Sequence, residues 1–111
     1  MHDIPEADWK VLRELHPVVL ERFCRGVLVE LSEVAAASET NAHQKYLAVW
    51  DLLNRRDGEL ADVFNDLRRS TALRHIACMK HRGLLSAEEF GRFSSTTRAT
   101  IETMLATRVS E

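Results

Sequence analysis

The chain has 111 residues, enough for one domain with one core, and its 45% hydrophobic and 29% charged residues are typical of a soluble globular protein. This composition excludes an intrinsically disordered chain, and no apolar run reaches the roughly 18 to 20 residues of a membrane span. The net charge of −2 excludes a strongly basic protein. Because the start, MHDIPEADWK, does not resemble a signal peptide, we expect a cytoplasmic protein.

Four glycines and two prolines are few for a protein of strands and turns, whereas Ala, Leu, Glu and Arg are plentiful and favour helix. The chain shows no repeat, no low-complexity tract and no linker. The composition therefore predicts a single all-α domain, a small bundle of four or five helices.

The first helix is predicted to begin at Pro5, because proline suits the first helical position. Glu6 and Asp8 then lie near the positive end of the helix dipole, where acids are favourable. Pro17 lacks the amide that would bond back one turn, so we expect the helix to break or kink near residues 15–16.

Two apolar stripes with alternating spacings of four and three residues follow, and each predicts a helix that packs along a neighbour. A polar loop at residues 38–41 separates them. The sequence therefore predicts an antiparallel helical hairpin of residues about 18–37 against 42–67. The first stripe is Leu20, Cys24, Val27, Leu31 and Val34, and the second is Tyr46, Trp50, Leu53, Asp57, Leu60, Phe64 and Leu67.

The run RRDGE in the second stripe allows two interpretations. Either Asp57 caps a new helix after a brief break, or one bent helix continues through Gly58 at a cost of roughly 1 kcal/mol. We favour the break. After Leu67 the apolar stripe rotates, so the chain changes its buried face or restarts a helix near residues 70–71.

The stretch HRGLLSAEEFGRFSS contains a helix stop and a helix start. Gly83 follows cations and suits the left-handed backbone that closes a helix. Ser86 and Glu89 form the pattern of a capping box, which predicts a short helix over residues 87–92 and another from residue 94 or 95. These helix-ending and helix-starting signals explain the sharp change of chain direction, and no catalytic role is needed to account for it.

His75, Cys78 and His81 form HxxCxxH on a predicted helix. Because steps of three residues turn the two histidines about 120° apart, they fit tetrahedral metal coordination poorly. We favour a buried cysteine beside two surface histidines and predict no metal site and no cofactor, although a metal or a reactive Cys78 stays an alternative. Only two cysteines are present, so Cys24 and Cys78 are expected to be reduced.

No catalytic motif is present, and the carboxylate pairs Glu88–Glu89 and Glu30–Glu33 are interpreted as helix capping and a solvated face. We predict no enzyme and no catalytic residue. The aromatic residues mostly fall on the apolar stripes, so core packing is their default role. They are Trp9, Phe23, Tyr46, Trp50, Phe64, Phe90 and Phe93.

Charge is distributed unevenly: residues 1–66 hold 13 acids and 7 bases, and residues 67–111 hold 4 acids and 8 bases. Such a split marks a partner surface or lets one part of the bundle dock on another. The stretch 68–82 could also belong to a helix-turn-helix DNA binder, but the acids at 88–89 and the pI near 6.2 argue against it. The possible partner or nucleic-acid surface is Arg68, Arg69, Arg74, Lys80 and Arg82.

The segment LRHIACMKHRGLLSAEEFGRF, residues 73–93, resembles the short C-terminal helical-hairpin module found at the ends of many bacterial proteins. The likeness lies in a helix, then residues 83–86, then Glu88-Glu89-Phe90, whereas the basic run that follows in the module is replaced by Phe93-Ser94-Ser95. The resemblance implies oligomerisation and protein contacts. The whole chain also resembles short, uncharacterised bacterial all-helical proteins, and that likeness implies no activity.

Together these patterns predict a non-enzymatic protein-interaction or regulatory module that self-associates. The expected partner is a second copy of the chain or another protein, and no membrane is expected. The alternative hypothesis is a small nucleic-acid-binding regulator that uses the basic stretch 68–82.

Overall fold

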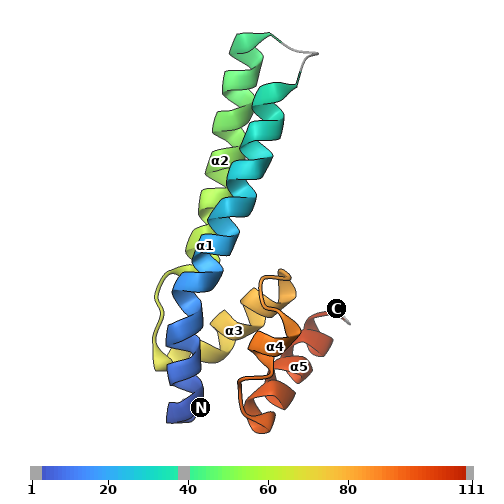
Figure 1. Ribbon diagram of the computed structural model, residues 1–111. Coiled ribbons are helices and arrows are strands. Elements are labelled where there is room, and N and C mark those ends of the chain that lie inside the picture. Colours follow the sequence, from blue (N-terminus) through green and yellow to red (C-terminus); the bar gives the residue numbers. More distant parts are fainter. Residues whose placement is uncertain (1–3, 38–40, 110–111) are drawn as a thin grey trace.

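The helix-favouring composition produces the expected class of fold. In the computed structural model, the described residues, 4–37 and 41–109, form five α-helices, one short 3₁₀ helix and no strand. The all-α class and the antiparallel hairpin are confirmed (Figure 1). In chain order the elements are α1 (Glu6–Ala36), α2 (Ala42–Phe64), η1 (Arg69–Thr71), α3 (Ala72–His81), α4 (Ala87–Phe90) and α5 (Ser95–Val109).

Helix α1 is continuous, and Pro17 lies inside it. Of the break or kink predicted near residues 15–16, the break is therefore wrong. Pro17 points to solvent, whereas Leu15 and Val19 on either side of it are buried in the core. A proline inside a helix costs about 3 kcal/mol, and burial of the flanking apolar residues offsets this cost.

Helix α2 is also continuous and runs through Gly58, so the favoured break at RRDGE is wrong. Its start is capped by the Asn41 side chain, which accepts a hydrogen bond from the Gln44 amide at 2.8 Å. Arg56 donates to Glu59 one turn further along and to Glu30 of α1, both at 2.9 Å. These pairs hold α2 on both sides of Gly58, which explains why the glycine does not end the helix.

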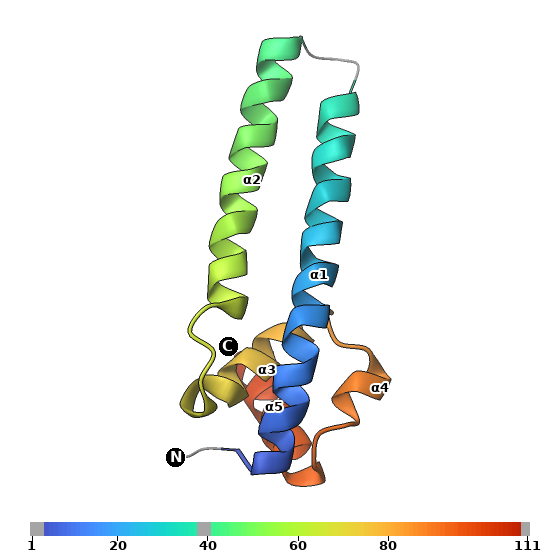
Figure 2. The same ribbon diagram turned by 60° about the vertical axis from the view of Figure 1, so that its left-hand side comes forward.

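The core lies at the base of the hairpin. Figure 2 shows α3, α4 and α5 gathered around the lower half of α1, while the upper part of the hairpin extends beyond them. The molecule is correspondingly elongated, with extents of 52 × 31 × 24 Å. The fully buried apolar side chains come from the hairpin and from the C-terminal part of the chain, and include Leu12, Val19, Val63, Ile76, Met79, Phe93 and Ile101.

The corner after α3 follows the predicted punctuation. Gly83 has a positive φ of 72°, and the amides of Gly83 and Leu84 donate to Lys80 and Met79 at 3.0 and 2.9 Å. This pair of bonds is the Schellman ending of a helix. The capping box of α4 is also confirmed, since the Glu89 amide donates to Ser86 Oγ at 3.1 Å and the Ser86 amide to Glu89 Oε1 at 2.8 Å.

Asp8 joins α1 to the start of α5. Its carboxylate is 2% exposed and accepts hydrogen bonds from the Ser94 amide at 2.8 Å, the Ser94 hydroxyl at 2.7 Å and the Thr97 hydroxyl at 2.6 Å. Burial alone raises the pKa of this carboxyl, but the hydroxyls of Thr97 and Ser94 and the Ser94 amide lower it below its usual value. Asp8 therefore accepts a hydrogen bond from the Ser94 amide, which has no backbone partner among the described residues at the start of α5.

None of the helices in residues 4–37 and 41–109 combines the length and the apolar character that a bilayer span requires.

Candidate interaction surface

One face of the hairpin exposes large apolar side chains. Tyr46 is 68% exposed, Trp50 60%, Leu53 45% and Leu28, on α1, 63%. The first three belong to the stripe that was predicted to be core, so core packing is wrong for them. The stripe reaches the core only toward its end, where Phe64 is buried and Leu60 and Leu67 pack against the core. Helices α3, α4 and α5 lie around the base of the hairpin, and its upper part extends beyond them.

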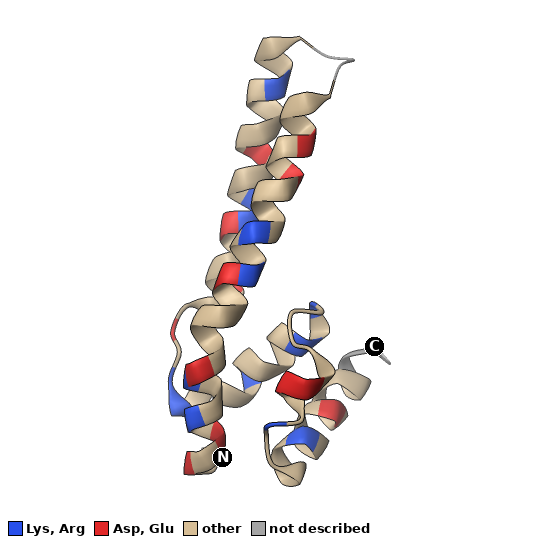
Figure 3. Ribbon diagram, viewed as in Figure 1, with Lys and Arg blue, Asp and Glu red and all other residues tan. Residues whose placement is uncertain are grey.

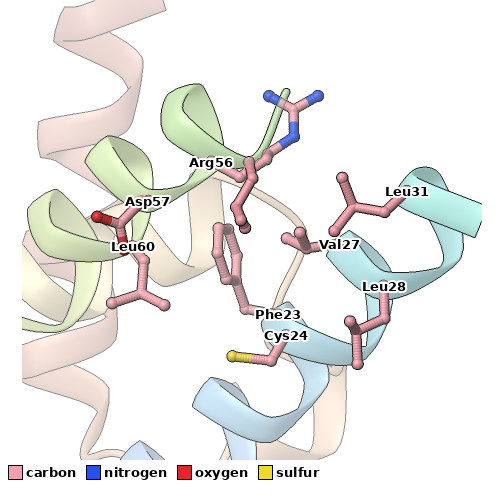
Figure 4. A pocket seen from close by; sticks show the side chains of 9 residues that line it. Phe23, Cys24, Val27, Leu28, Leu31, Arg56, Asp57 and Leu60 are labelled. Carbon is pink, nitrogen blue, oxygen red and sulfur yellow. The ribbon is translucent and has the colours of Figure 1, made fainter. Parts of the chain in front are cut away.

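Leu28 and Leu53 border a groove between α1 and α2 (Figure 4). Phe23 and Val27 are buried beneath it, and Asp57 lies on its α2 side. A second apolar hollow, nearer the tip of the hairpin, contains Tyr46 and Trp50 and shares Leu53 with the first. We call this continuous surface the apolar face; it comprises Cys24, Leu28, Leu31, Ala35, Tyr46, Trp50, Leu53, Asp57 and Leu60.

Ion pairs hold the two helices of the hairpin together, and their central residue, Arg56, also lines the groove. Arg56 binds Glu30 across the two helices at 2.9 Å, and Arg82 at the end of α3 binds Glu59 at 3.1 Å. The hydrogen bond from Arg56 lowers the pKa of Glu30. Acidic and basic residues are interleaved along the hairpin (Figure 3).

Asp57 and Tyr46 are the two members of the apolar face with strong hydrogen-bonding groups. Neither side chain forms a hydrogen bond or an ion pair with another residue in the part of the chain that the structure describes. Both are exposed, so water satisfies them in a single copy. Their polar atoms are available to a partner that covers this face.

Two residues of the predicted basic surface, Arg68 and Arg69, lie at η1. Arg68 forms an ion pair with Asp66 at 2.9 Å. Arg69 turns toward the start of α1, where it donates to Glu6 and to the Ile4 carbonyl, both at 2.8 Å.

The remaining basic residues lie along α3 and also have intramolecular partners. Lys80 lies 4.4 Å from the centre of the Phe90 ring, and Arg74 donates to a backbone carbonyl of α2 at 3.4 Å. Arg82 binds Glu59, as described above. The structure therefore turns Arg69 and Arg82 in different directions rather than gathering the stretch 68–82 on one open surface.

The uneven charge of the chain is partly neutralised within the molecule. Arg69 and Arg82 from the basic part pair with Glu6 and Glu59 from the acidic part, and Arg92 pairs with Glu14. These ion pairs between the acidic and the basic part of the chain hold the C-terminal helices against α1 and α2. Docking of one part of the bundle on another was one of the two interpretations of the uneven charge.

The HxxCxxH pattern does not gather its side chains. His75 is fully buried, and its ring nitrogens lie 2.6 and 3.1 Å from the carbonyl oxygens of Val63, in the last turn of α2, and Asp66, just beyond it. Cys78 is half-buried and His81 is exposed, so the interpretation of two surface histidines is wrong for His75. Within residues 4–37 and 41–109, no three side chains of the metal-binding types lie together. Cys24 and Cys78 are free thiols.

Arg22 is a residue that the sequence did not single out. Its guanidinium binds both carboxylate oxygens of Glu89, at 2.8 and 3.0 Å, and donates to the Leu84 carbonyl. The hydrogen bonds from Arg22 and from the Ser86 amide lower the pKa of Glu89 to about 2. No local signal marks Arg22, because its partner lies 67 residues away.

No protein-family model, no curated protein and no solved structure matches this chain. The likeness of residues 73–93 to the bacterial helical-hairpin module stays a prediction.

Proposed function

We propose that this protein is a non-enzymatic interaction or regulatory module that self-associates, and that the apolar face of the hairpin is its contact surface. The observation that carries the proposal is the exposure of Trp50 at 60% and Tyr46 at 68% on a stripe with regular helical spacing. Monomeric proteins rarely expose a contiguous apolar patch larger than a few hundred Å² unless it has a partner.

The architecture of the hairpin supports this proposal. A helix gains most of its stability from packing its apolar side, and an isolated helical pair in water has little to pack against. The upper part of α1 and α2 lies beyond α3, α4 and α5 and has only the other helix of the hairpin as a neighbour (Figure 2). Covering the apolar face would give this part of the hairpin the packing that the base already has.

The alternative, a small nucleic-acid-binding regulator, has less support. Arg68, Arg69 and Arg82 form ion pairs with acidic side chains, and these contacts compete with phosphate for the same guanidinium groups. A salt-dependent mobility shift tests this alternative. Binding that weakens after charge reversal of Arg68, Arg69 and Arg74 would favour it over the proposal.

Light scattering coupled to size exclusion, over a range of micromolar concentrations, tests the proposal. We expect the mass of an oligomer for the natural chain and the mass of a monomer for Leu53→Glu, because a buried, unpaired carboxylate opposes association. The matched control is Ala48→Glu, on the exposed and more polar side of α2, which we expect to leave the oligomer intact. A strict monomer for the natural chain would contradict self-association.

A further inference from the structure

We propose that the second copy binds antiparallel, so that Tyr46 and Trp50 of each copy cover the groove of the other and Tyr46 donates a hydrogen bond to the partner's Asp57. This inference rests on the self-association proposed above and specifies its geometry. The product is a two-fold symmetric four-helix arrangement.

The spacing of the α2 stripe is the same in both directions. Tyr46, Trp50, Leu53 and Asp57 are separated by four, three and four residues. A two-fold axis that crosses α2 between residues 51 and 52 therefore places Tyr46 opposite the partner's Asp57 and Trp50 opposite the partner's Leu53. A two-fold interface uses one surface twice and must be self-complementary, which this stripe is.

The apolar face is also complementary in shape to a second copy of itself that is related by this two-fold rotation. Its end near the tip carries the bulky, exposed rings of Tyr46 and Trp50. Its end near the base is the groove between α1 and α2, bordered by Leu28, Leu31 and Leu60 (Figure 4). Antiparallel pairing puts the rings of one copy over the groove of the other, and such interdigitation packs helices at interior density.

Charge complementarity supports the same arrangement. Asp57 is the acid of the apolar face, and burying its carboxylate without a partner would be unfavourable. The proposed axis brings the hydroxyl of the partner's Tyr46 and, beside it, the ammonium group of the partner's Lys45 toward Asp57. A parallel pair would instead set Asp57 against the partner's Asp57, and like charges at close range repel.

The exposed apolar side chains supply part of the area that a stable pair buries. Aromatic side chains of this size bury roughly 150–250 Å² each. Tyr46, Trp50 and Leu28 are each more than half exposed, so together with their neighbours they offer several hundred Å² of apolar surface per copy. Stable interfaces bury on the order of 800 Å² per partner, counting the polar rim.

A double-mutant cycle on the dimer dissociation constant tests this pairing. Tyr46 and Asp57 lie about 16 Å apart along one helix, so they do not touch within a copy. We expect Tyr46→Phe and Asp57→Ala each to weaken the dimer about tenfold, and the double variant to be no weaker than the weaker single variant. The matched control is Gln44→Ala with Arg55→Ala, which has the same separation on exposed positions and should show additive effects.

Distances between spin labels on the two copies provide a second test. In a chain with Cys24→Ala and Cys78→Ala, labels at Gln44→Cys should be separated along the helix axis by about 22 Å and labels at Ala48→Cys by about 10 Å. Parallel pairing predicts no such difference.

The two proposals fail in different ways. A chain that is monomeric at every concentration overturns both. A second outcome overturns only this geometry. In that case Leu53→Glu dissociates the dimer, but Tyr46→Phe and Asp57→Ala act additively and the two label distances are equal. Self-association would then still stand.

Discussion

Arg22 on α1 and Glu89 on α4 form a bidentate ion pair, in which Nη1 and Nη2 of the arginine lie 2.8 and 3.0 Å from the two carboxylate oxygens. The same carboxylate accepts the Ser86 amide at 2.8 Å and so completes the cap of α4. One side chain thus fixes the start of a short helix and ties it to the hairpin. This contact, with those of Asp8 and Arg92, holds the C-terminal part of the chain against α1.

Glu89→Gln is expected to lower the free energy of unfolding by about 1 kcal/mol at neutral pH, because water screens an ion pair whose arginine is 41% exposed. The folded pKa of Glu89, about 2, lies below the usual 4.5. Its stabilisation is therefore present above pH 4.5 and is lost as the pH falls toward 2. Urea titrations across this pH range should show a smaller decline for Glu89→Gln than for the natural chain. An identical decline would contradict this role, and Glu88→Gln, at an exposed neighbour, is the control.

Asp8→Ala is expected to lower the free energy of unfolding by about 2–3 kcal/mol, because it leaves the Ser94 amide and the Thr97 hydroxyl without their buried acceptor. Chemical denaturation measures this loss. Lys10→Ala, on the same helix but exposed, should change stability by less than about 0.5 kcal/mol. Equal effects of the two substitutions would show that Asp8 does not anchor α5.

Pro17→Ala is expected to raise the free energy of unfolding by about 1–2 kcal/mol. The substitution restores an amide that can bond within a continuous helix, and the gain is reduced because proline also restricts the unfolded chain. Pro5→Ala is the control, since Pro5 precedes the first helical residue, where the missing amide has no consequence. No gain at Pro17 would indicate that the helix is interrupted there.

Gly58→Ala and Gly83→Ala are expected to act in opposite directions. Gly58 lies inside α2, and the space that a methyl group would occupy there is open, so alanine should stabilise the chain by about 1 kcal/mol. Gly83 has a φ of 72°, which alanine adopts at a cost of about 1–2 kcal/mol. Thermal unfolding of both variants measures the contrast, and a loss of stability for Gly58→Ala would favour a break in α2.

Local patterns predicted much of the fold. Alternating spacings of four and three residues predicted the hairpin, because they place apolar side chains on one side of a helix. The ends of α3 and α4 were predictable because Gly83, Ser86 and Glu89 act on backbone groups within a few residues. The continuity of α1 and α2 was not predictable from such patterns. A single proline or glycine lowers helix stability by only about 1–3 kcal/mol, and packing against distant residues outweighs this cost.

Periodicity predicted which residues share the apolar face but not what covers it. Tyr46 and Trp50 follow the same spacing as Phe64, yet only Phe64 reaches the core. The difference arises from α3, α4 and α5, and Asp8 and Arg22 hold α5 and α4 against α1 through residues far along the chain. No short sequence pattern records such contacts.

The fluorescence of Trp50, measured in a Trp9→Phe chain as its concentration is raised from nanomolar to high micromolar, tests the central claim most directly. Trp50 is then the sole indole, and it is 60% exposed in a single copy. We predict that its emission moves to shorter wavelengths with increasing concentration, as a second copy removes the ring from water, and that Leu53→Glu abolishes the change. An emission that stays characteristic of a water-exposed indole at every concentration would contradict the claim that the apolar face joins two copies of this chain.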